Sequence, residues 1–316
     1  HMSGPSWTPS WMLHPGQPMP PRIWQVVSGG RAVDCGYRNP FTAPLVLRAE
    51  ELQLRTVVSR FRQHPAIEVW NLGNEPDIFA WLADAAGGKE WTRRMTTLIR
   101  EIDPNHPVTC GLHVASLLED NGLRVNDVFN EVDIPVMHGY PMYADWSNGP
   151  LDSDFVPFLC ALTTALCGKP SLMEEFGGCT AAPGQASFVH EWQRYGNPFR
   201  QFMASEEDLA AYIEAVLPKL VEVGALGAMI WCYADYIPAL YDRPPCDQAW
   251  HERFFGLVRP DGSLKPHAEV IKRFAASRPV VQPARRPVSL DVTPEAYYQA
   301  PKRHAVRLYH TFSGGR

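Results

Sequence analysis

The sequence lacks the patterns that mark membrane and nucleic-acid-binding proteins. Its 316 residues contain no uninterrupted apolar run near the roughly 18–20 residues that cross a bilayer, so we expect no membrane association. Its 29 basic residues are outnumbered by 34 acidic ones, which gives a formal net charge of −5. A chain with this balance has no general attraction to phosphate backbones, and nucleic acid is therefore not expected as a partner.

The sequence also lacks the motifs that bind nucleotide cofactors, hold metal ions or carry the nucleophile of serine hydrolases. No GxGxxG or GxxxxGK[ST] loop is present to cradle a phosphate, and no HExxH or CxxC spacing is present to hold a metal. We therefore expect no cofactor and no metal. The absence of a GxSxG elbow argues against a serine hydrolase.

The seven cysteines are odd in number and show no disulfide spacing, so we expect reduced thiols, which favour the cytoplasm. The first residues show no basic segment followed by an apolar stretch, so we expect no secretory signal. Ten Trp, eleven Tyr and thirty Pro stand out against this background. Proline-rich loops that carry aromatic residues suit a scaffold whose connections build a binding cleft.

Helical and strand-like patterns alternate from about residue 40 onward. We expect helices at residues 45–63, 91–102, 115–128, 155–166, 206–223 and 266–275, and apolar strands at residues 66–72, 108–112, 134–137, 171–173 and 228–234. This order predicts an α/β fold with a parallel sheet. A TIM-type (β/α)8 barrel is favoured over a doubly wound sheet, because polar residues follow the strand ends and no Gly-rich phosphate loop follows an early strand.

Two acidic motifs stand at expected strand ends. Asn74-Glu75-Pro76 follows the first apolar strand, and Glu174-Glu175-Phe176-Gly177 ends a strand 100 residues later. Glycoside hydrolysis needs such a carboxyl pair, because one group protonates the leaving oxygen while the other attacks the anomeric carbon or activates water. An isolated Glu at a strand end is more often a salt-bridge partner, but two in these contexts favour the catalytic interpretation.

With His138-Gly139-Tyr140 after a strand and Trp231 in the last strand, these motifs resemble the retaining glycoside hydrolases of clan A, in particular the cellulase-like family 5 and its relatives. The resemblance covers residues 45–275. It implies a retaining glycosidase that cleaves β-glycosidic bonds of a saccharide through a two-carboxylate double displacement.

The resemblance also implies roles for individual residues. Glu75 would be the general acid/base and Glu175 the nucleophile. The substrate-binding residues would be Asn74 at the sugar 2-hydroxyl, Tyr140 as hydrogen-bond donor to the nucleophile, His138 in the same subsite, and Trp231 as a stacking platform. Glu174 is the alternative to Glu175. Neighbouring strand residues point to opposite faces, so we expect one of the two to face the barrel mouth, and the Phe-Gly that follows favours Glu175.

The chain departs from the family pattern at its start. In this clan the Asn-Glu-Pro motif ends strand four, whereas here one clear helix precedes it, so we expect an N-terminally truncated barrel of about five recognisable parallel strands. Residues 1–276 would form this catalytic domain, and residues 277–316 an extension that packs on the barrel or on a partner. Because the unpaired strand edges need cover, we expect a homodimer. The alternatives are a carbohydrate-binding pseudo-enzyme that lost turnover with the missing strands and, third, an assembly protein.

Overall fold

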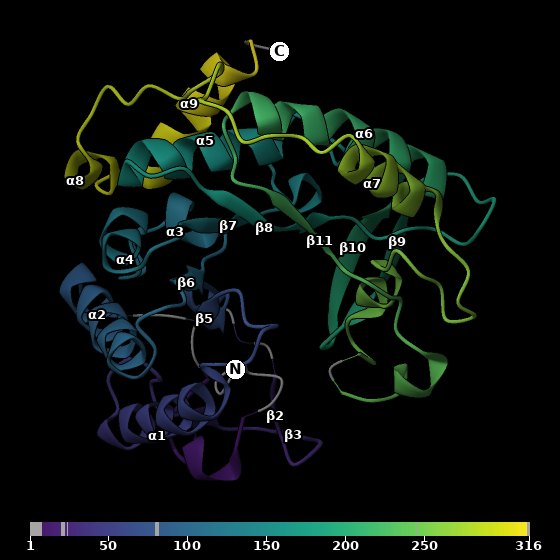
Figure 1. Ribbon diagram of the computed structural model, residues 1–316. Coiled ribbons are helices and arrows are strands. Elements are labelled where there is room, and N and C mark those ends of the chain that lie inside the picture. Colours follow the sequence, from purple (N-terminus) through teal and green to yellow (C-terminus); the bar gives the residue numbers. More distant parts are fainter. Residues whose placement is uncertain (1–7, 20–22, 24, 80–81, 245, 315–316) are drawn as a thin grey trace. The chain divides into compact units, whose positions relative to one another are not determined.

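The computed structural model describes residues 8–19, 23, 25–79, 82–244 and 246–314 (Figure 1). Two compact units can be distinguished. The first comprises residues 1–137, 163–171 and 289–307, and the second comprises residues 138–162, 172–288 and 308–316. No helix in the described part of the chain is long and apolar enough to cross a membrane.

The first unit contains two short antiparallel sheets and one parallel pair. Its elements are η2 (Ser10–Met12), β1 (Leu13–His14), β2 (Val26–Ser28), β3 (Arg31–Val33), β4 (Gly36–Tyr37), α1 (Pro44–Phe61), β5 (Trp70–Asn74), η3 (Pro76–Ile78), α2 (Ala85–Ile102), β6 (Val108–Gly111), α3 (Ala115–Leu118), α4 (Val125–Glu131) and α8 (Pro294–Tyr297). β1 pairs with β4 and β2 with β3, both antiparallel. β5 and β6 are parallel, with Trp70 opposite Val108 and Asn74 opposite Gly111.

Helix α2 shows why these segments are helical. The side chain of Asp84 caps its N-terminus by accepting a hydrogen bond of 3.0 Å from the Gly87 amide. Its apolar residues recur at helical spacing and are buried: Trp91, Met95, Leu98 and Ile99. Burying that face against the unit stabilises the helix more than its intrinsic propensity does.

The second unit contains β8 and β11, two strands of a three-stranded sheet with the order β11-β8-β7. Its elements are η4 (Pro141–Tyr143), β8 (Leu172–Gly177), β9 (Phe188–Arg194), β10 (Asn197–Met203), α6 (Glu206–Glu222), β11 (Ala228–Trp231), η5 (Pro238–Leu240), η6 (Trp250–Phe254) and α7 (Pro266–Ala276), while β7 (Val136–His138), α5 (Phe155–Cys167) and α9 (Pro301–Phe312) have residues in both units. β8 and β11 are parallel. α6 and α7 lie side by side (Figure 1), and the Arg273 guanidinium meets the Glu214 carboxylate across them at 3.0 Å.

The expected alternation of strands and helices is present, with differences in detail. Within the described residues the largest sheet has three strands and no closed barrel is formed. The first strand begins at Trp70 rather than at residue 66, and its side chains are half-buried or exposed rather than buried. The strand pairs with β6 along one side, and in the described part of the chain no strand pairs with its other side.

The helix expected at 115–128 is two helices, α3 and α4. The chain turns between them at Asn121-Gly122, where the Asn121 side-chain amide donates to the backbone carbonyl of Asp77 at 3.0 Å. Gly122 has a φ of 89°, and a Cβ there would lie 2.4 Å from the Cβ of Leu82. Glycine is therefore required, and a continuous helix is excluded.

The segment between β8 and α6, expected to be a loop, contains an antiparallel hairpin. β9 and β10 pair along their whole length from Arg194–Asn197 to Phe188–Met203. Tyr195 and Gly196 form the two-residue turn with φ values of 51° and 76°. Two consecutive positive φ values are typical of the turn that matches strand twist, so the Tyr-Gly pair between two strand-like runs was the available signal.

The C-terminal residues include α8 and α9. In the first unit the hydroxyl of Tyr297 donates to the Leu117 carbonyl at 2.6 Å, and that of Tyr298 donates to the Ser116 carbonyl at 2.8 Å. In the second unit the ring of Tyr309 packs edge-on against Trp146, at 5.4 Å between ring centroids. Tyr297, Tyr298 and Tyr309 are all buried, so the expected extension contributes core residues to each unit.

Candidate active site

Glu75 lies immediately after β5 in a left-handed backbone conformation, with φ 49° and ψ 47°. This region is unfavourable for a residue with a side chain. The surrounding bonds hold it there: the Glu75 amide donates to the Gly111 carbonyl at 2.7 Å, and its carbonyl accepts from the Ile78 amide at 3.1 Å. Strained residues concentrate at functional sites, so this observation marks Glu75 as a candidate.

Asp77 is a buried carboxylate that the motif analysis did not single out. It accepts hydrogen bonds from the backbone amides of His113 and Ser116, at 3.0 and 3.1 Å, and from the Ser116 hydroxyl at 2.9 Å. Burial raises its pKa. The acidic residue that directly follows Asn-Glu-Pro was the available signal. Asp77 anchors the turn after Glu75 to the start of α3.

The two asparagines of β5 differ in their surroundings. The side-chain oxygen of Asn71 accepts from the amides of Gly111 at 3.1 Å and Gly73 at 3.0 Å, so Asn71 joins the strand ends. Asn74 is exposed at the last position of β5, next to Glu75. Its position leaves the amide accessible to a ligand hydroxyl.

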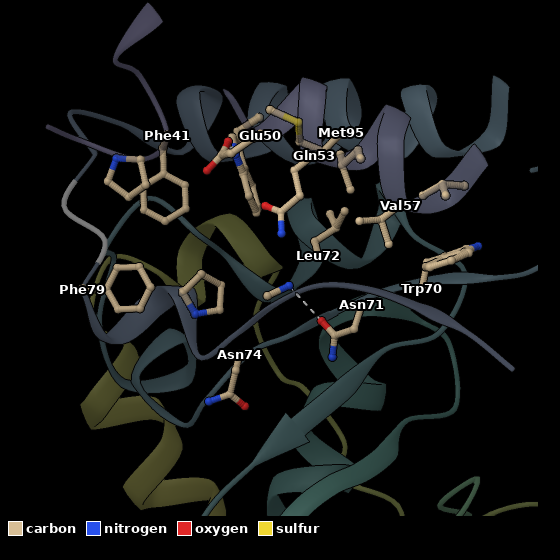
Figure 2. A pocket seen from close by; sticks show the side chains of 16 residues that line it. Phe41, Glu50, Gln53, Val57, Trp70, Asn71, Leu72, Asn74, Phe79 and Met95 are labelled. Atoms are coloured by element: carbon tan, nitrogen blue, oxygen red, sulfur yellow. Dashed lines mark hydrogen bonds between the residues drawn. The ribbon is translucent and has the colours of Figure 1, made fainter. Parts of the chain in front are cut away.

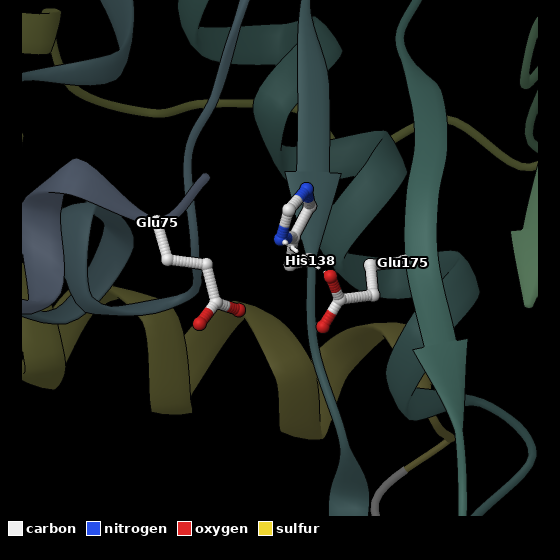
Figure 3. A group of neighbouring side chains, drawn as sticks. All are labelled: Glu75, His138 and Glu175. Atoms are coloured by element: carbon white, nitrogen blue, oxygen red, sulfur yellow. Dashed lines mark ion pairs between the residues drawn. The ribbon is translucent and has the colours of Figure 1, made fainter. Parts of the chain in front are cut away.

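The second unit brings Tyr140, His138 and Glu175 together, and Figure 3 shows the His138 ring beside the Glu175 carboxylate. The Tyr140 hydroxyl donates to Oε1 of Glu175 at 2.6 Å, and Nδ1 of His138 lies 3.4 Å from Oε2 of the same carboxylate. The Gly139 amide also donates to the Glu175 carbonyl at 3.1 Å. The segment after β7 therefore fixes both the backbone and the carboxylate of Glu175.

Glu174 contacts the other side of the same imidazole. Nε2 of His138 lies 3.1 Å from Oε2 of Glu174. The His138 side chain is 2% exposed, and those of Glu174 and Glu175 are 16% and 13% exposed. Adjacent strand residues thus reach different nitrogens of one buried ring, and Glu174 orients His138.

Trp231 ends β11 opposite Gly177. A Cβ on Gly177 would lie 2.5 Å from the Trp231 carbonyl oxygen, so the glycine of Glu-Phe-Gly permits this close approach of the two strands. Trp231 is half-buried and packs against the cluster that contains Tyr140 and Phe255. Trp231 therefore packs against the same cluster as Tyr140, whose hydroxyl contacts Glu175.

Lys265 and Asp235 form a buried ion pair. Nζ of Lys265 donates to Oδ1 of Asp235 at 2.8 Å and to the Thr180 hydroxyl at 2.8 Å, and the Gly256 amide donates to the same Asp235 oxygen at 2.7 Å. Burial raises the pKa of Asp235 and lowers that of Lys265. Asp235 therefore links the loop after β11 to Lys265 and to the backbone of Gly256.

Comparison with known proteins identifies the family. The sequence family described as "Glycosyl hydrolases family 2, TIM barrel domain" matches residues 24–275. The chain belongs to this glycosyl hydrolase family. The predicted TIM-barrel type of fold is confirmed by this match and by the solved structures below.

The curated relatives include a probable mannan endo-1,4-beta-mannosidase F from Aspergillus flavus, 29% identical over 154 residues, and a probable mannan endo-1,4-beta-mannosidase C from Aspergillus terreus, 29% identical over 182 residues. The matches cover 43% and 50% of this chain. The chain spans 32% and 42% of the lengths of these two relatives.

Solved structures of similar fold also match the chain. An exo-beta-1,4-mannosidase, Op5Man5, from Opitutaceae bacterium strain TAV5 matches with a TM-score of 0.62 and 26% identity, over 81% of this chain and 45% of that chain. A GH5_18 protein from Streptomyces cattleya in complex with GlcNAc matches with a TM-score of 0.67 and 18% identity, over 88% of this chain and 67% of that chain. The expected kinship with clan A glycoside hydrolases, family 5 or a close relative, is confirmed, although the matching domain description is that of family 2.

Proposed function

We propose that this glycosyl hydrolase domain is a retaining glycosidase that cleaves β-mannosidic bonds. The observation that carries the proposal is the environment of Glu175. Its two carboxylate oxygens meet the Tyr140 hydroxyl and the His138 ring, which hold the group in one orientation. A carboxylate that accepts such contacts is suited to act as an oriented nucleophile.

In the first step, Oε2 or Oε1 of Glu175 forms a bond to the anomeric carbon while the bond from that carbon to the glycosidic oxygen breaks. Glu75 gives its proton to the departing oxygen, so the leaving group departs as a neutral alcohol. The product of the step is a glycosyl ester on Glu175. A retaining enzyme requires the two carboxyl groups to stand about 5–5.5 Å apart.

In the second step, the ionised Glu75 takes a proton from water, and the water oxygen bonds to the anomeric carbon. The ester bond to Glu175 breaks, which restores the free carboxylate. The two inversions together retain the configuration at the sugar. Asn74 would hold the sugar 2-hydroxyl in both steps, and Trp231 would offer its indole face to the C–H side of the ring.

The sugar is inferred from the relatives. The curated relatives are named as mannan endo-1,4-beta-mannosidases, and one matching structure is titled as an exo-beta-1,4-mannosidase. We therefore assign a β-1,4-linked mannoside as the substrate. The test is hydrolysis of 4-nitrophenyl β-mannoside and mannohexaose, with 4-nitrophenyl β-glucoside as the matched comparison.

Glu75→Ala and Glu175→Ala should each remove nearly all hydrolysis, while Glu174→Ala should retain much more. Azide should restore turnover of Glu175→Ala on the nitrophenyl substrate and give a glycosyl azide of inverted configuration. Near-parental activity in either Glu75→Ala or Glu175→Ala would refute the assignment. Binding of mannohexaose by calorimetry without any turnover of the parent protein would favour the pseudo-enzyme alternative.

A further inference from the structure

The first unit contains a cavity of about 280 Å³ between helices α1 and α2 and strand β5 (Figure 2). Four aromatic side chains line it: Phe41, Trp70, Phe79 and Trp91. Asn74, proposed above as a substrate contact, lines the cavity, whereas Glu75 does not. The volume is close to the lower end of about 300 Å³ for small-molecule sites, which suits a ligand built on one ring.

One carboxyl group, that of Glu50 on α1, lines this cavity. Its Oε2 accepts a hydrogen bond of 3.1 Å from the indole nitrogen of Trp91 on α2. In the described part of the chain Oε1 accepts no hydrogen bond, so Glu50 can receive a donor from a ligand. Burial raises the pKa of Glu50 to about 7, which shows that its charge is poorly solvated.

Arg94 acts on this carboxyl group without an ion pair to it. Arg94, on α2, lies 2.6 Å from Oε1 of Glu51 and is held there by that ion pair. Arg94 lowers the pKa of Glu50, Glu51 raises it, and burial outweighs both. A positive group placed at Glu50 would therefore supply charge compensation that the described protein groups do not.

The aromatic walls favour the same kind of ligand. Phe41 lies edge-on to Trp91, with 5.1 Å between ring centroids, and stacks with Phe79 at 6.4 Å and 26°. Aromatic faces attract cations, and flat apolar bodies pack well between such rings. Further apolar side chains complete the walls: Leu54, Val57, Val58, Leu72 and Met95.

We propose that the cavity between α1, α2 and β5 is a binding site for a small organic cation with a flat apolar body, whose ammonium or amidinium group meets the Glu50 carboxylate. The ring of the ligand would lie among Phe41, Phe79 and Trp91. The side-chain amide of Gln53, which also lines the cavity, would accept a second N–H from the ligand.

The experiment uses benzamidine as the probe and benzamide as its neutral match. Calorimetry on the whole chain at pH 8 should show one saturable site for benzamidine and none for benzamide. The affinity should fall at least about tenfold in Glu50→Gln, which keeps an oxygen for the Trp91 indole, and by a similar factor at pH 5.5, where Glu50 is protonated. Glu90→Gln, on the exposed face of α2, should bind like the parent.

A second readout does not depend on the variant. In NMR spectra of the parent protein, the chemical shift of the Trp91 indole N–H should change as benzamidine is added. It should stay the same when benzamide is added. Equal binding of the two probes, unchanged affinity in Glu50→Gln, or no saturable binding at pH 8 would each overturn the proposal. An affinity that weakens as the protein concentration rises would show that a second copy of the chain occupies the cavity, and would overturn it too.

Discussion

The hydroxyl of Tyr140 donates a hydrogen bond of 2.6 Å to Oε1 of Glu175, although 35 residues separate the two in sequence. The bond joins the loop after β7 to the end of β8. Because the acceptor is a carboxylate, the bond is charge-assisted and stronger than one between neutral groups. It therefore fixes where the proposed nucleophile can point.

Tyr140→Phe should lower kcat/KM for 4-nitrophenyl β-mannoside. Losing a hydrogen bond to a charged group costs about 1.5–3 kcal/mol, which corresponds to a decrease of roughly 10- to 100-fold. Tyr241→Phe is the matched control, because the Tyr241 ring would keep its position 4.4 Å from the Arg253 guanidinium. Parental kcat/KM in Tyr140→Phe would show that the bond does not contribute to catalysis.

Lys265→Met should destabilise the protein strongly. The Lys265 and Asp235 side chains are 2% and 5% exposed, so the substitution leaves Asp235 as a buried charge without its partner. Breaking such a pair costs about 3–5 kcal/mol, measured as the free energy of unfolding in urea. Lys272→Met on the exposed face of α7 should cost little. The double variant Asp235→Asn with Lys265→Met should recover much of the loss, and additive losses would contradict this account.

The helices were the most predictable part of the fold. α6 was expected at 206–223 and spans Glu206–Glu222, because the Ser205 hydroxyl caps it by accepting from the Asp208 amide at 3.0 Å, and acidic residues fill its first turn. These signals lie within a few residues of one another. The hairpin of β9 and β10 was missed because its turn signal, Tyr195-Gly196, includes a tyrosine, a residue type that rarely adopts a positive φ.

The sequence motifs named candidate site residues but did not predict the contacts between them. The motifs placed Glu175 at a strand end and Tyr140 after the strand before it. They did not predict that His138 contacts Glu174 through Nε2 and Glu175 through Nδ1. That arrangement depends on the packing of β7 against β8, which brings together residues 36 and 37 positions apart. The anchoring role of Asp77 depends on a similar contact, with His113 and Ser116.

His251 should make stability depend on acid pH. It is 2% exposed, and burial lowers its pKa from 6.5 to about 3. Between these two values the unfolded chain carries the proton and folded His251 does not. The free energy of unfolding should therefore fall as the pH decreases through this window, by about 1.4 kcal/mol per pH unit.

The measurement is urea unfolding at several values between pH 6.5 and pH 4, for the parent and for His251→Gln, which keeps a hydrogen-bonding group for the Tyr143 hydroxyl, 3.0 Å from Nε2 of His251. The variant should show a shallower decrease, by about one proton. His267, whose pKa burial lowers to about 4, and Glu50, with its raised pKa, contribute equally to both proteins and cancel in the difference. The exposed His310→Gln serves as the control. Identical slopes in parent and His251→Gln would contradict the prediction.

The homodimer expected from the sequence stays a prediction, and the edge of β11 gives it a testable form. In the described part of the chain β11 pairs with β8 along one side, and Met229 on β11 is 51% exposed. An uncovered strand edge with an apolar side chain is a template for pairing with another chain. Light scattering should therefore give twice the monomer mass of 35.5 kDa at micromolar concentration.

Met229→Lys should shift the protein toward the monomer, because a charged residue on an edge strand opposes pairing. Val189→Lys, at a side chain that is 43% exposed on the β9 hairpin, should leave the dimer intact. A single species of 35.5 kDa at every concentration of the parent would show that the chain works alone and that this edge needs no second copy.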